Sequence, residues 1–262
     1  MCLYLCRRMK ALIPFLICLL GAFGSSVRAQ NATNAQGKRT GKWVLTDTTG
    51  RKTAEGLYKN GERIGLWTFY RESGAVKAET EFMEDGQTAN FKFFHPNGKV
   101  AGEGMYLHQK RHGKWLFYDT DGTLLSEENY KEGKLHGQVL NYHINGQLYE
   151  KWTYEQGQKQ GLWEQYFDTG VLKARGAYEQ GKLNSPVVFF YSSGRMFLSG
   201  KYINDLREGP FTYYKENGQV EMVLRYHKGV LNPEDQEKLG EKSDPQYLPE
   251  DILRQKFMEE GP

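Results

Sequence analysis

A 24-residue period constrains the fold of this chain more than any single motif does. The period is clearest in the segment Gly113–His136 and occurs eight times without insertion or deletion. The units are residues 41–64, 65–88, 89–112, 113–136, 137–160, 161–184, 185–208 and 209–232. A fixed period of roughly 20–50 residues is the signature of repeat architectures, so each unit should be one small element stacked on copies of itself.

The tenth position of the unit is glycine in every copy and marks a turn. These glycines are Gly50, Gly74, Gly98, Gly122, Gly146, Gly170, Gly194 and Gly218. Turn-forming residues precede them, as expected for a hairpin loop that ends in a residue with a positive φ angle. Only glycine adopts that conformation without steric cost, so the sequence predicts a backbone requirement at this position.

The residues on both sides of this turn have the composition of β-strands. Before the turn, the third position is mostly aromatic or β-branched and the sixth is Tyr or Phe in seven copies. After it, the twelfth position is usually aliphatic, positions 13, 15 and 17 are mainly polar, and the eighteenth is always aromatic: Tyr58, Phe82, Tyr106, Tyr130, Tyr154, Tyr178, Tyr202 and Tyr226. Alternation of this kind predicts a half-buried strand with one wet face. Glycine at the sixteenth position in four copies, such as Gly104, leaves room for a neighbouring ring.

A second turn connects each unit to the next, so each unit is predicted to be one β-hairpin. One hairpin is marginally stable in water, and stacked neighbours must supply its missing contacts. The predicted fold class is all-β: an elongated, twisted antiparallel sheet of about eight hairpins. Three copies of the second turn depart from the consensus, with a late Gly86, with Gln109 and with Asp205, and we expect these turns to be less regular.

The residues of this second turn resemble a known repeat family. The segment Tyr130–Gly137 has the spacing Y-x-x-G-x-x-H-G and is similar to the signature of MORN repeats. The longer unit, with G-x-W-x-x-Y at Gly113–Tyr118, resembles the variant MORN repeat of bacterial proteins labelled YwqK-type antitoxins. The resemblance covers residues 41–232 and implies a twisted antiparallel sheet with a binding or scaffolding role.

Residues 1–29 have the order of an export signal. Basic residues precede an apolar run from Ala11 to Phe23, and a short polar region ends at Ala29, where cleavage would leave Gln30 first. An uncleaved N-terminal anchor is the alternative. All three cysteines lie in this leader, so the mature chain would have no cysteine nucleophile, thiolate metal site or disulfide. We therefore expect an exported protein, periplasmic or extracellular.

Two segments flank the repeats. Residues 30–40 are small and polar, which predicts a flexible lead-in. Residues 233–262 form an acidic C-terminal tail with nine acidic and four basic residues. Apolar residues at helical spacing favour a short amphipathic helix over residues 248–258 that covers the last strand edge, and a disordered tail is the alternative.

A partner-binding site is expected where the period breaks, because residues needed equally by every unit serve the framework. The repeated aromatic residues could form a platform for glycans or peptides, but packing of the sheet explains them better. The breaks that we assign to partner binding are Asn141 and Gln165 at a usually apolar position and Trp152 at a usually small one.

The sequence contains no catalytic constellation and implies no cofactor. Serine-hydrolase, zinc-protease, phosphate-loop and dinucleotide motifs are absent. His108 and His112 have a metal-like spacing, but a hairpin connection does not place them on one face, so no metal site is predicted. Nucleic acid is not an expected partner of an exported chain.

These observations predict a non-enzymatic, exported repeat scaffold that binds another protein or a cell-envelope component through its sheet surface. One alternative is a membrane-surface module whose basic turns, such as the one around Lys110 and Lys114, bind anionic lipid. Another is an antitoxin-like binding protein, as the family label suggests. The sequence specifies neither the individual partner nor the oligomeric state.

Overall fold

The computed structural model describes residues 30–239, which form 22 strands and one helix. The predicted leader and the helix expected over residues 248–258 lie outside this range. The first strands of the eight hairpins are β2 (Arg39–Thr46), β4 (Glu62–Tyr70), β6 (Thr88–Phe94), β8 (Lys110–Tyr118), β11 (Gly137–Tyr142), β14 (Gly161–Tyr166), β17 (Pro186–Phe190) and β20 (Gly209–Tyr214). The second strands are β3 (Lys52–Lys59), β5 (Val76–Phe82), β7 (Val100–Leu107), β9 (Leu124–Lys131), β12 (Leu148–Glu155), β15 (Leu172–Glu179), β18 (Met196–Ile203) and β21 (Val220–His227).

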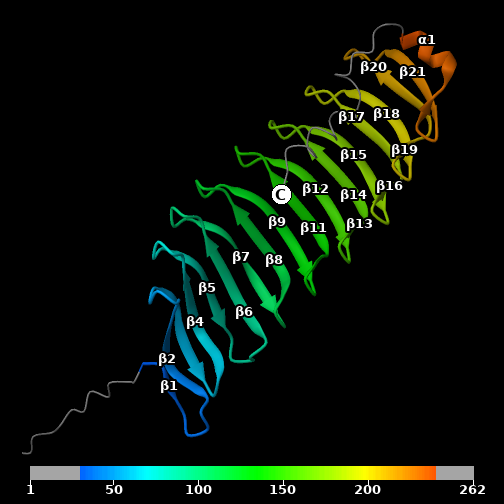
Figure 1. Cartoon of the computed structure of the whole chain (residues 1–262). Coiled ribbons are helices and arrows are strands. Elements are labelled where there is room, and N and C mark those ends of the chain that lie inside the picture. The colour runs from blue at the N-terminus through cyan, green and yellow to red at the C-terminus, as the bar shows by residue number, and fades with distance from the viewer. Residues whose placement is uncertain (1–29, 240–262) are drawn as a thin grey trace, which may run out of the picture.

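The remaining elements are short. The two-residue strands are β1 (Ala32–Thr33), β10 (Lys134–Leu135), β13 (Gln158–Lys159), β16 (Lys182–Leu183), β19 (Leu206–Arg207) and β22 (Val230–Leu231), and the helix is α1 (Pro233–Leu239). Figure 1 shows the hairpins stacked side by side along one axis, with β1 at one end and α1 at the other. The predicted fold class is confirmed: one long, open antiparallel sheet with a short helix after the last strand.

The first turn requires glycine, as predicted. In the fourth unit the amide of Gly122 donates to the Asp119 carbonyl oxygen at 3.1 Å, and Asp119 N donates to Thr123 O at 3.0 Å. The glycine that ends this loop has a φ angle of +88°, and its seven equivalents lie between +81° and +86°. Because a side chain at such a φ angle clashes with its own backbone, the periodic glycine serves the turn.

The second turn has two residues with positive φ angles, the geometry that matches the twist of antiparallel strands. In the fourth unit these residues are Glu132 (+52°) and Gly133 (+82°). The predicted irregularity of the third and seventh units is wrong, because Gln109 (+63°) and Asp205 (+68°) adopt the same conformation without glycine. In the second unit the late Gly86 does change the turn.

Neighbouring hairpins pair in one register along the whole array. Position 14 of each unit lies opposite position 5 of the next, and position 15 lies opposite position 4. At the first junction these pairs are Ala54 with Phe69 and Glu55 with Thr68. The same pairing occurs at the last junction, between β18 and β20. The constant register explains why no unit has gained or lost a residue, since a one-residue slip would exchange the two faces.

A β-bulge beside the first turn decides which residues share a face. In the second unit Phe69 pairs with Ala78 but Tyr70 pairs with Val76, so Lys77 has no partner opposite it. Directly paired residues project from the same face, so Val76 lies with Tyr70 and not with Phe69. All eight hairpins have this shift. The predicted simple alternation after the turn is therefore wrong at the twelfth position.

The two faces of the sheet differ in chemistry. The core face carries positions 3, 5, 14, 16 and 18, which are mostly aromatic or small. The glutamate face carries positions 2, 4, 6, 15 and 17, including the glutamates at position 15 of the first four units.

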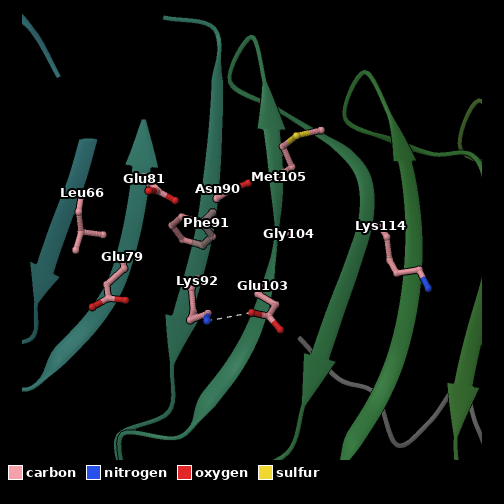
Figure 2. A pocket seen from close by; sticks show the side chains of 10 residues that line it. All are labelled: Leu66, Glu79, Glu81, Asn90, Phe91, Lys92, Glu103, Gly104, Met105 and Lys114. Atoms are coloured by element: carbon pink, nitrogen blue, oxygen red, sulfur yellow. Dashed lines mark ion pairs between the residues drawn. The ribbon is translucent and has the colours of Figure 1, made fainter. Parts of the chain in front are cut away.

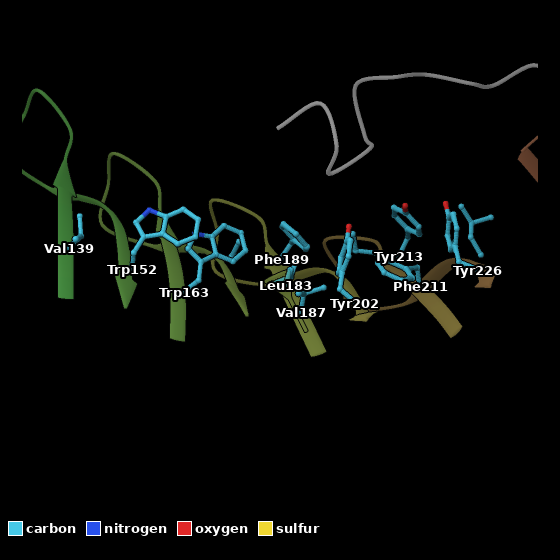
Figure 3. Packing of buried hydrophobic residues seen from close by; sticks show 13 residues of the cluster. Val139, Trp152, Trp163, Leu183, Val187, Phe189, Tyr202, Phe211, Tyr213 and Tyr226 are labelled. Carbon is cyan, nitrogen blue, oxygen red and sulfur yellow. The ribbon is translucent and has the colours of Figure 1, made fainter. Parts of the chain in front are cut away.

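The core face buries aromatic rings against glycine. Trp67 has no exposed surface, and a Cβ built on Gly56 would lie 2.4 Å from its indole. The Tyr58 ring meets the same indole edge-on at a centroid distance of 4.9 Å. Figure 3 shows the larger core cluster as a row of side chains along consecutive strands, from Val139 to Tyr226. Each unit thus completes its core with side chains of its neighbour.

Both flanking segments are partly ordered. Residues 32–33 form β1, which pairs with β2, so the prediction of a flexible lead-in over residues 30–40 is wrong at this strand. At the other end, α1 packs against β21. Asp235 of this helix is completely buried and accepts a hydrogen bond from the backbone amide of Arg225 at 2.8 Å.

Candidate binding site

The aromatic residues of the repeat are used in packing. Tyr58, Tyr202 and Tyr226 of the eighteenth position are buried, and their equivalents are half-buried or contact the next unit. Tyr178, for example, meets the Trp152 ring edge-on at 5.3 Å, and burial raises its pKa. The core face therefore offers few whole aromatic rings to a ligand.

An arginine that the sequence analysis missed completes this packing. The guanidinium of Arg111 lies 4.6 Å from the centre of the Trp115 ring and donates to the Tyr130 hydroxyl at 2.9 Å. Arg39, Arg63 and Arg207 stack in the same way on Trp43, Trp67 and Phe211. The signal was present at position 23, which is Arg, Lys or Leu in every unit except the second. Because a stacked cation is an interaction of the core, these arginines do not form a free basic surface.

The three residues assigned to partner binding come together on the core face. Asn141 pairs with Glu150 across β11 and β12, and Glu150 pairs with Gln165 across β12 and β14. Trp152 lies two residues beyond Glu150 on the same strand and stacks on Trp163 at 5.7 Å. The sequence analysis did not predict this juxtaposition, which follows from the pairing of β11, β12 and β14.

Burial limits what this cluster offers to a partner. Gln165 is 5% exposed and donates to the Tyr149 hydroxyl at 2.9 Å, and Trp152 is 8% exposed beneath the Lys159 ammonium. The buried Glu150 carboxylate accepts from the Trp163 indole N–H at 3.1 Å. Asn141 is half-buried and is the most accessible of the three. Their role in partner binding stays a prediction.

The glutamate face carries acidic and basic side chains that pair with one another across the strands. Glu55 accepts a short hydrogen bond from the Tyr70 hydroxyl of the next unit and pairs with Lys52 at 2.9 Å. These contacts lower the pKa of Glu55 to about 2, with the Tyr70 hydrogen bond as the largest cause. The arrangement recurs at Glu127, which accepts from Tyr142 at 3.0 Å and pairs with Lys114 at 2.7 Å. Burial and this bond raise the pKa of Tyr142 to about 12.

Between these two sites the glutamate face is hollowed into a groove over units two to four. Its lining residues are Leu66, Glu79, Glu81, Asn90, Phe91, Lys92, Glu103, Gly104, Met105 and Lys114. These residues lie on the consecutive strands β4 to β8. Figure 2 shows their side chains, with the Lys92–Glu103 ion pair (3.2 Å) among them. The groove volume is about 480 Å³. This size suits a segment of chain laid across the strands.

Two glutamates in this groove have no paired lysine, unlike the neighbouring glutamates of the same face. Within residues 30–239, neither the Glu79 nor the Glu81 side chain forms a hydrogen bond or an ion pair. Leu66 beside them is 53% exposed. The sequence signal was the second unit itself, the only one with glutamate at both position 15 and position 17. We define Leu66, Glu79, Glu81 and Met105 as the groove cluster.

The character of the glutamate face changes along the array. Position 15 is glutamate in the first four units and then becomes Lys151, Arg175, Ser199 and Val223. Uncompensated acidic groups are therefore confined to the N-terminal half of this face. A partner that selects them has to carry positive charge.

The basic turns are largely engaged within the chain. Arg111 is stacked on Trp115, and Lys114 projects from the glutamate face to pair with Glu127.

In the part of the chain that the structure describes, no three His, Cys, Asp or Glu side chains are placed to share a metal ion. Among the same residues, no helix has the length and hydropathy needed to cross a bilayer.

Comparisons with known proteins agree with the repeat architecture. The model of the MORN repeat variant family matches residues 87–108, 111–132, 135–156, 159–180 and 207–228. The first four matches begin 24 residues apart, which is the period found in the sequence. No curated protein matches the chain.

Among solved structures, the similarities are partial. A TarM structure is 18% identical with a TM-score of 0.28, covering 35% of this chain and 18% of that one. An S. aureus TarM mutant in complex with fondaparinux, alpha-GlcNAc-glycerol and UDP is 14% identical with a TM-score of 0.29, covering 37% and 19%. TcdB2-TccC3-Cdc42 is 12% identical with a TM-score of 0.23, covering 76% and 13%. The chain spans less than a fifth of each of these proteins, and TM-scores this low do not establish a shared fold.

Proposed function

The chain belongs to the MORN repeat family, and from that membership we propose that it is an exported, non-enzymatic scaffold that binds another protein or a cell-envelope component. Members of this family form β-sheet scaffolds for protein or lipid interactions. The region that we assign to the partner is the groove over units two to four of the glutamate face.

The observation that carries this proposal is the pairing of uncompensated charge with exposed apolar surface. Glu79 and Glu81 lie beside Leu66 and Met105 in one groove, whereas Glu55, Glu103 and Glu127 of the same face are neutralised by lysines. Carboxylates without partners add no stability to the sheet, and exposure of the apolar Leu66 side chain to water is unfavourable. A protein segment with lysine or arginine next to apolar residues would satisfy both groups.

Export is proposed from the leader, because residues 1–29 have the order of a cleaved signal and contain every cysteine of the chain. The absence of an enzymatic role is proposed from the missing motifs. The carboxylates of the glutamate face also support it, because most are held in ion pairs with neighbouring lysines.

The test is capture of partners from envelope extracts by the purified protein, compared with a Glu79→Lys, Glu81→Lys variant. We expect the variant to lose a specific band that the unaltered protein retains. A matched control changes Glu72 and Asp121 to lysine, since both side chains are 86% exposed on first turns and the net charge changes equally. Equal capture by the groove variant and the control variant would reject the groove as the binding site.

Anionic lipid is the other partner class, and the structure favours it less. The basic residues proposed for it are split between the core face, where Arg111 lies, and the glutamate face, where Lys114 lies. Co-sedimentation with phosphatidylserine vesicles at low salt, lost at high salt, would support lipid binding instead. An antitoxin-like role remains an expectation from the family label alone.

A further inference from the structure

The two ends of the array present the same backbone edges that join its internal units. At every internal junction, positions 14 and 15 of one hairpin pair with positions 5 and 4 of the next. At the N-terminal end the corresponding residues are Leu45 and Val44 on β2. At the C-terminal end they are Met222 and Val223 on β21. At these four positions, each end therefore lacks the strand that the other end could supply.

At the N-terminal end, β1 pairs with Arg39 and Thr40 of β2, and the residue before β1, Asn31, closes the edge at Val44. The Asn31 side chain donates to Val44 O at 3.1 Å and accepts from Val44 N at 2.8 Å, as a neighbouring strand would. The Asn31 amide also donates to Lys42 O at 2.9 Å. Because Val44 occupies the position through which every other unit pairs with its predecessor, Asn31 stands in for a preceding hairpin.

The C-terminal edge is closed by the helix. Asp235 accepts from the Arg225 amide at 2.8 Å and pairs with the Arg225 guanidinium at 3.2 Å. The helix begins at Pro233, where a ninth unit would start. Within the described residues, no strand pairs with the outer edge of β21 at Met222 and Val223.

We propose that these two ends are complementary surfaces for a second copy of this chain, joined head to tail in the register of the internal junctions, and that Asn31 and Asp235 keep them closed. The contact would place β21 of one copy beside β2 of the next. This inference is independent of the partner proposed for the groove.

Three features favour a second copy over an unrelated strand. At positions 4, 5, 14 and 15 the edges have the register of the seven internal junctions, so the backbone pairs of those positions would form again. The core would also continue, because Trp43 and Leu45 pack in the cluster at one end, and Met222 and Leu224 pack in the cluster at the other. Exposed strand edges invite such pairing, and proteins commonly cover them. A contact between two different surfaces does not close on itself, so repeated use of it gives an open filament.

The test opens each end with one substitution in the purified full chain. Asn31→Pro removes the side-chain amide that pairs with Val44. Proline also does not adopt the φ angle of +58° found at this residue. Asp235→Lys places a second cation against Arg225 in a completely buried site, which expels the helix from the edge. Light scattering after gel filtration measures the mass of each variant alone, of their equimolar mixture, and of the double variant.

The proposal predicts a different mass for each sample. Each single variant has one open end and stays monomeric, like the unaltered chain. Their mixture forms a particle of twice the monomer mass, closed at both ends, and the double variant forms filaments. Assembly of either single variant alone would show non-specific edge pairing and overturn the proposal, as would a mixture that stays monomeric while circular dichroism shows both variants folded.

Discussion

Gly104 lies directly beneath the indole of Trp115, so that a Cβ built on the glycine would lie 2.3 Å from the ring. The two residues belong to adjacent hairpins and recur as Gly56 with Trp67 and Gly200 with Phe211. Each unit therefore provides the space that the large side chain of the next unit fills. This relationship explains how a sheet of short hairpins completely buries Trp67 and Trp115.

Gly104→Ala should destabilise the protein by about 1–3 kcal/mol, because the added methyl group overpacks the ring. The matched control is Gly176→Ala, where the nearest atom is a Val187 methyl at 3.0 Å and the strain is smaller. Urea unfolding followed by tryptophan fluorescence measures both changes. An equal loss of stability in the two variants would contradict this account of the packing.

Gln109→Gly should stabilise the protein by about 1 kcal/mol, because it removes a side chain from a positive φ angle. Gln109 has a φ angle of +63° at the turn position where Gly133 stands in the next unit. Part of the gain is offset by the greater freedom of glycine in the unfolded chain.

The reciprocal change, Gly133→Gln, should destabilise by a similar amount. Thermal unfolding of both variants checks this pair. If both substitutions shifted the midpoint in the same direction, turn strain would not be the cause.

The Glu55 carboxylate should make stability depend on pH in acid. Its pKa is lowered from 4.5 to about 2 in the folded state. A depressed pKa favours the folded state above the unfolded value, and this contribution is lost as the pH falls toward about 2. Glu55→Gln should therefore flatten the decline of the free energy of unfolding between about pH 4.5 and about pH 2.

Tyr70→Phe tests the hydrogen bond to Glu55 separately from the charge of the Glu55 carboxylate. It keeps the carboxylate but removes the hydrogen bond that lowers the pKa of Glu55 most. We expect it to flatten the acid dependence in part. An acid dependence unchanged by both substitutions would show that Glu55 makes no such contribution.

Arg111→Leu should leave stability nearly unchanged, whereas Arg111→Ser should cost about 2–3 kcal/mol. Leucine occupies this position as Leu135, Leu183 and Leu231, and all three pack in the core cluster. The prediction is that the apolar volume of the Arg111 side chain contributes more to stability than its charged group over Trp115. Chemical unfolding of the two variants measures the difference, and a loss in Arg111→Leu as large as in Arg111→Ser would indicate that charge dominates.

Much of the candidate site was not predictable from the sequence. Asn141, Trp152 and Gln165 were identified because they break the period, and they do gather on neighbouring strands. Their burial was not predictable, since it depends on the Lys159 and Tyr149 side chains that cover them. Glu79 and Glu81 resembled the solvated glutamates of other units. The register places Lys92 opposite Glu79, but its ammonium pairs with Glu103 on the next strand instead.

The sequence by itself determined the hairpins, their number and their turns, because these depend on residues close along the chain. Gly122, for instance, is demanded by the φ angle of its own turn. The tertiary structure alone decided that Val76 lies with Tyr70, that Arg111 stacks on a tryptophan, and that Asn31 and Asp235 close the two ends. The physical reason is that these contacts follow from strand register, from the bulges and from packing between units, none of which is encoded in the local period.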